Sequence, residues 1–120
     1  MDKYFVDNIE KIASHNKYFR EVLFTSNQMQ LVVMSLKPLE EIGMEIHPNV
    51  DQFFRFEQGN GIAILNGNIH ILRAGTALVV PAGVKHNIIN TSKKNPLKLY
   101  TIYAPPQHPP GTINKDKVTD

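Results

Sequence analysis

Cysteine is absent from the 120-residue sequence, so the chain has neither a disulfide framework nor thiolate chemistry. An excess of charge of one sign is absent too, because 13 Lys and Arg residues stand against 11 Asp and Glu residues, for a net charge of +2. Such a balance gives no support to nucleic-acid binding. No apolar run approaches the roughly 18 residues that a membrane span requires, and the N-terminus carries acidic residues in place of the apolar stretch of a signal peptide. We therefore expect a soluble, cytoplasmic protein that binds neither nucleic acids nor membranes.

The sequence does contain enough apolar material for a globular core. Hydrophobic residues make up 42% of the chain and charged residues 20%, which is ordinary for a globular protein. A chain of 120 residues has room for one domain, and we find no internal repeat. We therefore expect a single domain over residues 1–120.

Short strands separated by turns dominate the pattern. One short helix is predicted within residues 7–16. Runs of β-branched and aromatic residues predict strands over 19–25, 28–36, 53–57, 62–65, 69–72, 77–80, 86–90 and 98–103, and Asn66-Gly67 is a strong signal for a two-residue hairpin. From Ala104 the chain is rich in proline and cannot continue a β-ladder, so 98–103 is the last predicted strand. The pattern predicts an all-β barrel or sandwich with a short N-terminal extension, a core at about 19–104 and an extended tail over 105–120.

One stretch delivers a histidine to the predicted interior. Over residues 75–90 an apolar strand leads into a turn specified by Pro81 and Gly83, and a second strand then begins at His86. His86 and Ile88 share a parity and therefore lie on one face of that strand. If Ile88 faces the core, His86 lines the interior of the barrel.

The spacing in this stretch resembles the second motif of the cupin family: Gly, five residues, Pro, any residue, Gly, two residues, His, three residues and Asn. Every fixed position is matched, by Gly75, Pro81, Gly83, His86 and Asn90. The resemblance covers about residues 31–104 and is closest to small single-domain cupins that are loosely labelled mannose-6-phosphate-isomerase-like. It implies a cupin-type double-stranded β-helix, which is a jelly-roll barrel.

The first motif of the same family is matched in part. In the family, a His-x-His pair is followed by a Glu seven residues before a Gly, and these side chains hold a metal ion together with the later His. Here His47 takes the place of the first histidine, Asn49 that of the second, and Gln52 that of the Glu before Gly59. The turn between Asn49 and Gln52 is one residue shorter than usual. The resemblance thus implies His47, Asn49, Gln52 and His86 as metal ligands.

Two further residues are alternative ligands. Asp51 could supply a carboxylate in place of Gln52 if the shortened turn rotates it inward, but strand parity favours Gln52, which then faces the pocket with Phe54 and Phe56. His108 could reach the site if the tail folds over the mouth of the barrel. We favour a solvated His108, because proline-rich termini are usually exposed.

A set of imidazole and oxygen donors suits zinc, nickel, iron and manganese alike. The implied set is neutral, so a divalent cation would keep its full charge there and favour an anionic ligand. The alternative interpretation is a pair of hydrogen-bonded core histidines in a barrel that holds no metal.

Three functions stay open at this point, and the sequence does not decide whether the protein is an enzyme. The first is a metal-binding cupin that acts on or binds a small polar or anionic ligand, such as a sugar, a sugar phosphate or a carboxylate. The second is a non-catalytic binding module, and the third is a metal-free structural barrel. The resemblance also implies a homodimer, in which exposed apolar strands such as 28–36 are covered by edge pairing.

Overall fold

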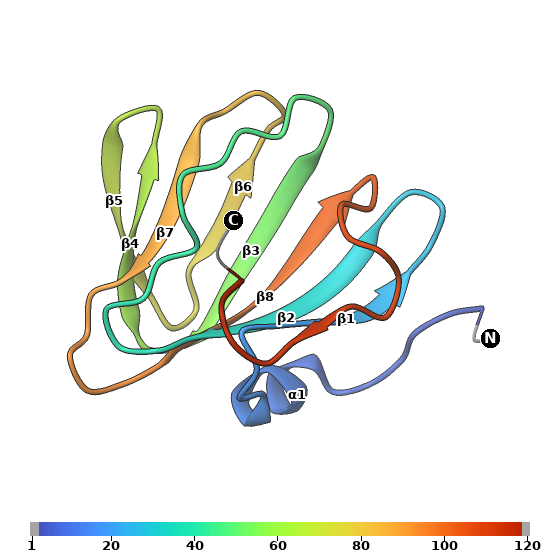
Figure 1. Cartoon of the computed structure of the whole chain (residues 1–120), viewed down its shortest axis with the longest axis horizontal. Helices are drawn as coiled ribbons and strands as arrows, with labels where there is room; N and C mark the ends of the chain where they lie inside the picture. The colour runs from blue at the N-terminus through green and yellow to red at the C-terminus, as the bar shows by residue number, and fades with distance from the viewer. Residues whose placement is uncertain (1–2, 119–120) are drawn as a thin grey trace.

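The structure, a computed structural model, describes residues 3–118 and folds them into two antiparallel sheets and one short helix (Figure 1). The elements in chain order are α1 Ile9–His15, β1 Arg20–Thr25, β2 Gln30–Leu36, β3 Asp51–Gln58, β4 Asn60–Leu65, β5 Asn68–Arg73, β6 Ala77–Val80, β7 His86–Asn90, β8 Leu97–Ala104 and β9 Ile113–Asn114. No helix among the described residues is long and apolar enough to cross a membrane. The all-β fold and the predicted helix are thereby confirmed.

The two sheets form the walls of a double-stranded β-helix, as expected. The larger sheet has the strand order β6-β3-β8-β2-β1-β9, and the smaller has the order β5-β4-β7. Alternation along the strands sends one set of side chains into the space between the sheets. The core consists largely of fully buried residues from both sheets, among them Met34, Leu36, Phe54, Phe56, Leu72, Ile88, Leu97 and Leu99.

The β4–β5 connection is the predicted two-residue hairpin. Asn66 has φ 48° and Gly67 has φ 85°, which is the left-handed pair that a type I′ turn requires. Leu65 pairs with Asn68 across this turn. The Asn-Gly prediction is confirmed.

An irregular segment, residues 40–47, runs along the free side of β7. Glu45 and His86 exchange two backbone hydrogen bonds, with N–O distances of 2.8 and 2.9 Å, and form an isolated antiparallel bridge. Further along, the amide of Ile42 donates to the carbonyl of Ile88 at 2.9 Å. These bonds align the segment with β7 although it is not a regular strand.

Asn90, the last residue of β7, joins three parts of the chain. Its Nδ2 donates to the carbonyl oxygens of Leu36, Lys37 and Asn95 at 3.1, 3.0 and 2.9 Å, and its Oδ1 accepts from the amide of Ser92 at 2.9 Å. The side chain is fully buried. It therefore joins the end of β2 to the β7–β8 loop through backbone groups of both.

The helix covers the outer face of the larger sheet. Its carboxyl end is bound by the ammonium group of Lys98 on β8, which donates to the carbonyls of Ser14 and Asn16 at 3.0 and 2.7 Å. Burial lowers the pKa of Lys98, and the nearby charge of Lys17 adds to this effect. The N-terminal extension thus packs on the outside of the barrel.

Two expectations about the edges of the fold are wrong. The segment 28–36 is not an exposed edge, because β2 lies between β8 and β1 inside the larger sheet. Residues 98–103 are not the last strand, because the tail returns to pair with β1 through β9. The proline-rich start of the tail is held by the buried Gln30, whose Oε1 accepts from the amides of Gln107 and His108 and whose Nε2 donates to the carbonyl of His108.

Replacing Asn90 tests how far the fold depends on its side chain. We expect Asn90→Ala to lower the free energy of unfolding by about 2–4 kcal/mol, because it removes four hydrogen bonds between a buried side chain and the backbone. Urea denaturation measures this loss. The control Asn49→Ala removes an exposed amide and should cost less than about 0.5 kcal/mol. An equal cost for both variants would contradict the role assigned to Asn90.

Candidate functional site

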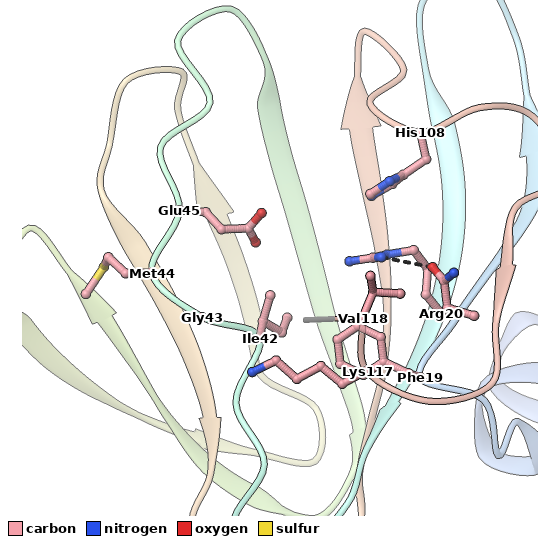
Figure 2. Close-up of a pocket in the computed structure, with 10 residues that line it drawn as sticks. Phe19, Arg20, Ile42, Gly43, Met44, Glu45, His108, Lys117 and Val118 are labelled. Carbon is pink, nitrogen blue, oxygen red and sulfur yellow. Dashed lines mark hydrogen bonds between the residues drawn. The ribbon is translucent and has the colours of Figure 1, made fainter. Parts of the chain in front are cut away.

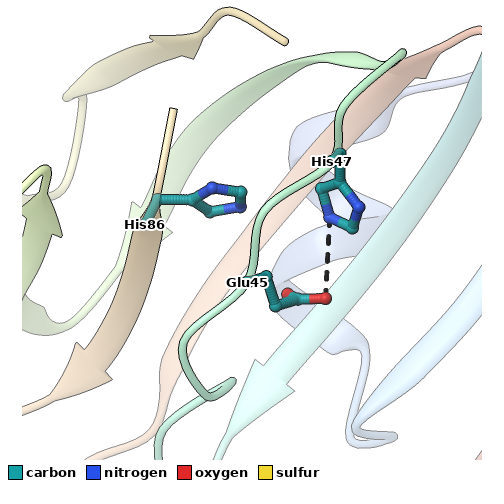
Figure 3. A group of neighbouring side chains, drawn as sticks. All are labelled: Glu45, His47 and His86. Atoms are coloured by element: carbon teal, nitrogen blue, oxygen red, sulfur yellow. Dashed lines mark ion pairs between the residues drawn. The ribbon is translucent and has the colours of Figure 1, made fainter. Parts of the chain in front are cut away.

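Three side chains that can ligate a metal meet inside the barrel mouth. Glu45 and His47 come from the irregular segment and His86 from the start of β7, and one ligand atom of each lies within 4.8 Å of the others. Figure 3 shows the carboxylate and both rings directed toward a common space. The residues 45 and 47 share a face because they are two positions apart, and the backbone pair of Glu45 with His86 puts the third side chain on that same face.

Hydrogen bonding decides which nitrogen of His86 is available. Its Nδ1 lies 2.9 Å from the carbonyl oxygen of Val84, which can only accept, so Nδ1 carries the proton. The lone pair is therefore on Nε2, which is buried and has no hydrogen-bond partner among the described residues. This is the state in which a histidine ligates a metal, with the other nitrogen held by a carbonyl.

His47 is held in the same neutral state. Burial lowers the pKa of His47, the nearby His86 lowers it further, and the carboxylate of Glu45 opposes both. The Nε2 of His47 lies 3.5 Å from the Glu45 carboxylate, as the dashed line in Figure 3 marks, and makes no hydrogen bond within the part of the chain described. Burial thus favours the neutral form of His47, in which one ring nitrogen carries an unshared electron pair.

Gln52 on β3 adds an oxygen to the inner wall. Its Nε2 donates to Thr101 Oγ1 at 3.0 Å, and that hydroxyl donates to the carbonyl of Phe53 at 2.8 Å, so the amide is held in one orientation. Its Oε1 is buried and unpartnered over residues 3–118. The two imidazole nitrogens and the carboxylate, whose ligand atoms lie within 4.8 Å of one another, fit a divalent transition-metal ion.

The structure does not bring Asn49 and Asp51 into this group. Asn49 is exposed. Asp51 is also exposed, and its Oδ1 accepts from the amide of Ala82 at 2.8 Å, so it supports the turn before β7. The inward orientation predicted for Gln52 is what the structure shows, since Gln52 is 3% exposed.

Glu45 is the residue that the sequence interpretation missed, and the spacing held a signal for it. Taking His47 and Asn49 as the pair left the turn before Gln52 one residue short. Taking Glu45 and His47 instead lengthens that segment by two residues, so that it is no longer shorter than the usual spacing. The pair is then Glu-x-His, and the acid comes before the histidine rather than after it.

His108 is not solvated, contrary to the favoured interpretation. The tail folds back so that its Nε2 lies 3.3 Å from the hydroxyl of Tyr103, and the two rings pack edge to face with centroids 5.1 Å apart. Burial lowers the pKa of His108 to about 4, with the charges of Arg20 and His47 contributing in the same direction. Burial also raises the pKa of Tyr103, which stays protonated.

A cavity of about 610 Å³ opens beside this group. Figure 2 shows the carboxylate of Glu45 on one wall and Arg20 and His108 on the other. The remaining lining residues are Phe19, Ile42, Gly43, Met44, Asn114, Lys117 and Val118. The tail after β8 therefore builds part of the wall, and Glu45 belongs both to the cavity and to the possible metal site.

Phe54 and Phe56 occupy a different position from the one predicted. Both face inward, as expected, but they are fully buried and do not line the cavity. The Phe54 ring packs edge to face on His86, with centroids 6.2 Å apart, and stacks on Phe56 at 6.1 Å. Phe54 therefore packs against the ring of His86, and Phe56 packs behind Phe54.

Comparison with known proteins places this arrangement among cupins. The family model described as a cupin domain matches residues 32–103. An uncharacterized protein of Acanthamoeba polyphaga mimivirus, L612, is 49% identical over 113 residues, which are 92% of this chain and 71% of that protein. YrkC of Bacillus subtilis is 49% identical over 121 residues, covering 96% of this chain but 64% of its own length. The crystal structure of BH2720 from Bacillus halodurans has a TM-score of 0.92 and 43% identity, with coverage of 94% of this chain and 89% of that one.

The low pKa of His108 predicts how stability depends on pH in protein freed of metal by a chelator. The unfolded chain takes up a proton near pH 6.5 and the folded chain near pH 4. The contribution of His108 is therefore complete above pH 6.5 and is lost as the pH falls toward 4. We expect His108→Gln to lose less stability over this interval than the wild type, as measured by urea denaturation at stepped pH. Parallel pH profiles for the two proteins would contradict the burial of a neutral His108.

Proposed function

Because the chain belongs to the cupin family, we propose that it binds a divalent metal ion through Glu45, His47 and His86, with Gln52 as a further donor, and holds a small polar or anionic molecule beside that ion. The single observation that carries this proposal is a set of buried, unpartnered atoms. Nε2 of both histidines and Oε1 of Gln52 have no hydrogen-bond partner among the described residues. Buried polar atoms are rarely left unpaired, and a cation beside Glu45 would satisfy both histidine nitrogens at once.

The charge of this set favours an anionic ligand. The two histidines and Gln52 are neutral, and Glu45 contributes one negative charge, so a divalent ion would leave a net charge of about +1 at the site. A carboxylate, a sugar acid or a sugar phosphate would offset the remaining charge, whereas a neutral sugar would bind through its hydroxyls alone. Zinc, nickel, iron and manganese all accept mixed nitrogen and oxygen ligands.

The bound ion would polarise an oxygen of the ligand, and the chain's own residues would orient that ligand and exclude water. A catalytic role is the second candidate function, and one observation favours it. His108 is a neutral imidazole close to the protonated hydroxyl of Tyr103. It is therefore a group at the cavity wall that can accept a proton.

We also propose that two copies of the chain associate through the outer face of the smaller sheet. The register places five isoleucines on this face, in opposed pairs across the strands: Ile62, Ile64, Ile69, Ile71 and Ile89. Ile69 and Ile71 are each 66% exposed. A largely apolar face that includes an edge strand is complementary to its own copy, which is what a two-fold interface needs.

Metal analysis of untagged protein tests the proposed site. We expect about one ion per chain in the wild type and none in the His47→Ala/His86→Ala double variant. Glu45→Gln should lower metal affinity, whereas the matched control Asn49→Ala should leave it unchanged, because Asn49 is exposed. His70→Ala removes an exposed histidine from β5 and controls for surface binding. Metal-free wild type, or equal metal in the double variant, would overturn the proposal.

Sedimentation measurements test the association. The wild type should behave as a particle of twice the 13.6-kDa chain mass, and Ile69→Glu/Ile71→Glu should sediment as a monomer because it places charges in the interface. Ile113→Glu, at an exposed position of β9, should leave the dimer intact. A monomeric wild type would refute the interface.

A further inference from the structure

Arg20 projects into the cavity from the first strand of the barrel. It pairs in register with Met34, which is fully buried in the core, and Val22 two positions on is 6% exposed. By alternation, Arg20 faces the interior as Val22 does. Figure 2 shows its guanidinium extending from β1 toward the wall that carries Glu45. A cation therefore lies across the cavity from the possible metal site.

The guanidinium is only partly used by the protein. Its Nη1 donates to Asn114 Oδ1 at 3.0 Å, across the short β1–β9 pair. Its Nε is buried and has no hydrogen-bond partner within residues 3–118. None of the ion pairs in that range includes Arg20. Asn114 thus holds the guanidinium at Nη1, the hydroxyl of Tyr103 lies within its hydrogen-bonding reach, and Nε is left without a partner among the described residues.

The neighbours of Arg20 supply donors rather than acidic partners. Arg20 and His108 line the same cavity, and the charge of Arg20 lowers the pKa of His108 and opposes the rise in the pKa of Tyr103. Tyr103 keeps its hydroxyl proton, and Lys117 lines the same cavity. Glu45 is the acid in the lining, and it stands with the histidines. The wall around Arg20 is therefore built to receive an anion.

We infer that Arg20 binds the carboxylate of a small hydroxy- or oxo-acid, whose second oxygen function reaches the metal at Glu45, His47 and His86. The metal contact rests on the proposed function, whereas the Arg20 contact does not. The planar guanidinium, with its unpartnered Nε, matches a planar carboxylate, as in arginine–carboxylate pairs. A phosphate group also needs an anion site but takes more donors than one partly used guanidinium supplies, so the carboxylate is the better fit.

Calorimetric titration of metal-loaded protein with lactate, pyruvate and gluconate tests this assignment. Lactamide, which replaces the carboxylate of lactate with a neutral amide, is the matched ligand control, and inorganic phosphate tests the other anion class. Arg20→Gln should weaken binding of the best carboxylate by about 10- to 100-fold, because a charge-assisted bidentate contact is lost. Arg20→Lys keeps the positive charge but lacks the planar guanidinium with its paired donors. It serves as a second variant in case Arg20→Gln fails to fold. Arg73→Gln removes an exposed arginine from β5 as a protein control.

The metal content of each variant separates the two proposals. Support requires that Arg20→Gln keep the metal of the wild type and lose carboxylate binding, with lactamide bound weakly by both. Equal carboxylate affinity in wild type and Arg20→Gln overturns the role of Arg20 and leaves the metal site standing. If the wild type holds no metal, the proposed function fails. Weaker carboxylate binding by Arg20→Gln than by the metal-free wild type would then still support the contact between Arg20 and the carboxylate. Binding of phosphate but of no carboxylate, or of neither, overturns the ligand class.

Discussion

The two backbone hydrogen bonds between Glu45 and His86 are the constraint on which the site depends. Residues 40–47 form no regular strand, so their side-chain directions are decided by backbone pairing with β7, of which this bridge lies closest to the ligands. It places the carboxylate and the imidazole on the inner face, and His47 follows two residues later on the same side. The amide of Gly83 also donates to the carbonyl of His47 at 2.9 Å, which ties the turn before β7 to the same segment. The geometry of the candidate ligands thus results from backbone pairing rather than from the conformation of an isolated loop.

The parts of the fold that sequence predicted well are those whose conformation is decided locally. Pro81 and Gly83 specify their turn whatever lies beyond it, and the Asn66-Gly67 hairpin needs nothing outside its own four residues. The first metal motif was different. Residues two apart share a face in any extended segment, so Glu45-x-His47 and His47-x-Asn49 satisfy alternation equally. The partner strand decides between them, and it lies about 40 residues away in the chain, where periodicity carries no information.

The tail was misread for a related reason. Proline cannot join a ladder, and this correctly excluded a regular strand directly after Ala104. It did not exclude a side chain taking the place of a strand partner, which is what Gln30 does for the backbone of residues 107 and 108. That contact spans 78 residues and has no local signature. Its result is that His108 lies against Tyr103 and the tail forms a wall of the cavity.

Glu45 belongs to the possible metal site and to the cavity wall at the same time. The binding of a metal ion and the binding of an anion in the cavity would therefore be thermodynamically linked. Without a cation, its carboxylate repels any anion that enters the cavity; with a cation bound, the repulsion becomes attraction. The ion then increases the affinity for the anion, and reciprocity requires that the anion increase the affinity for the ion by the same factor. A chain built this way retains its metal best when its ligand is abundant, so occupancy of the ion would itself report the supply of the ligand.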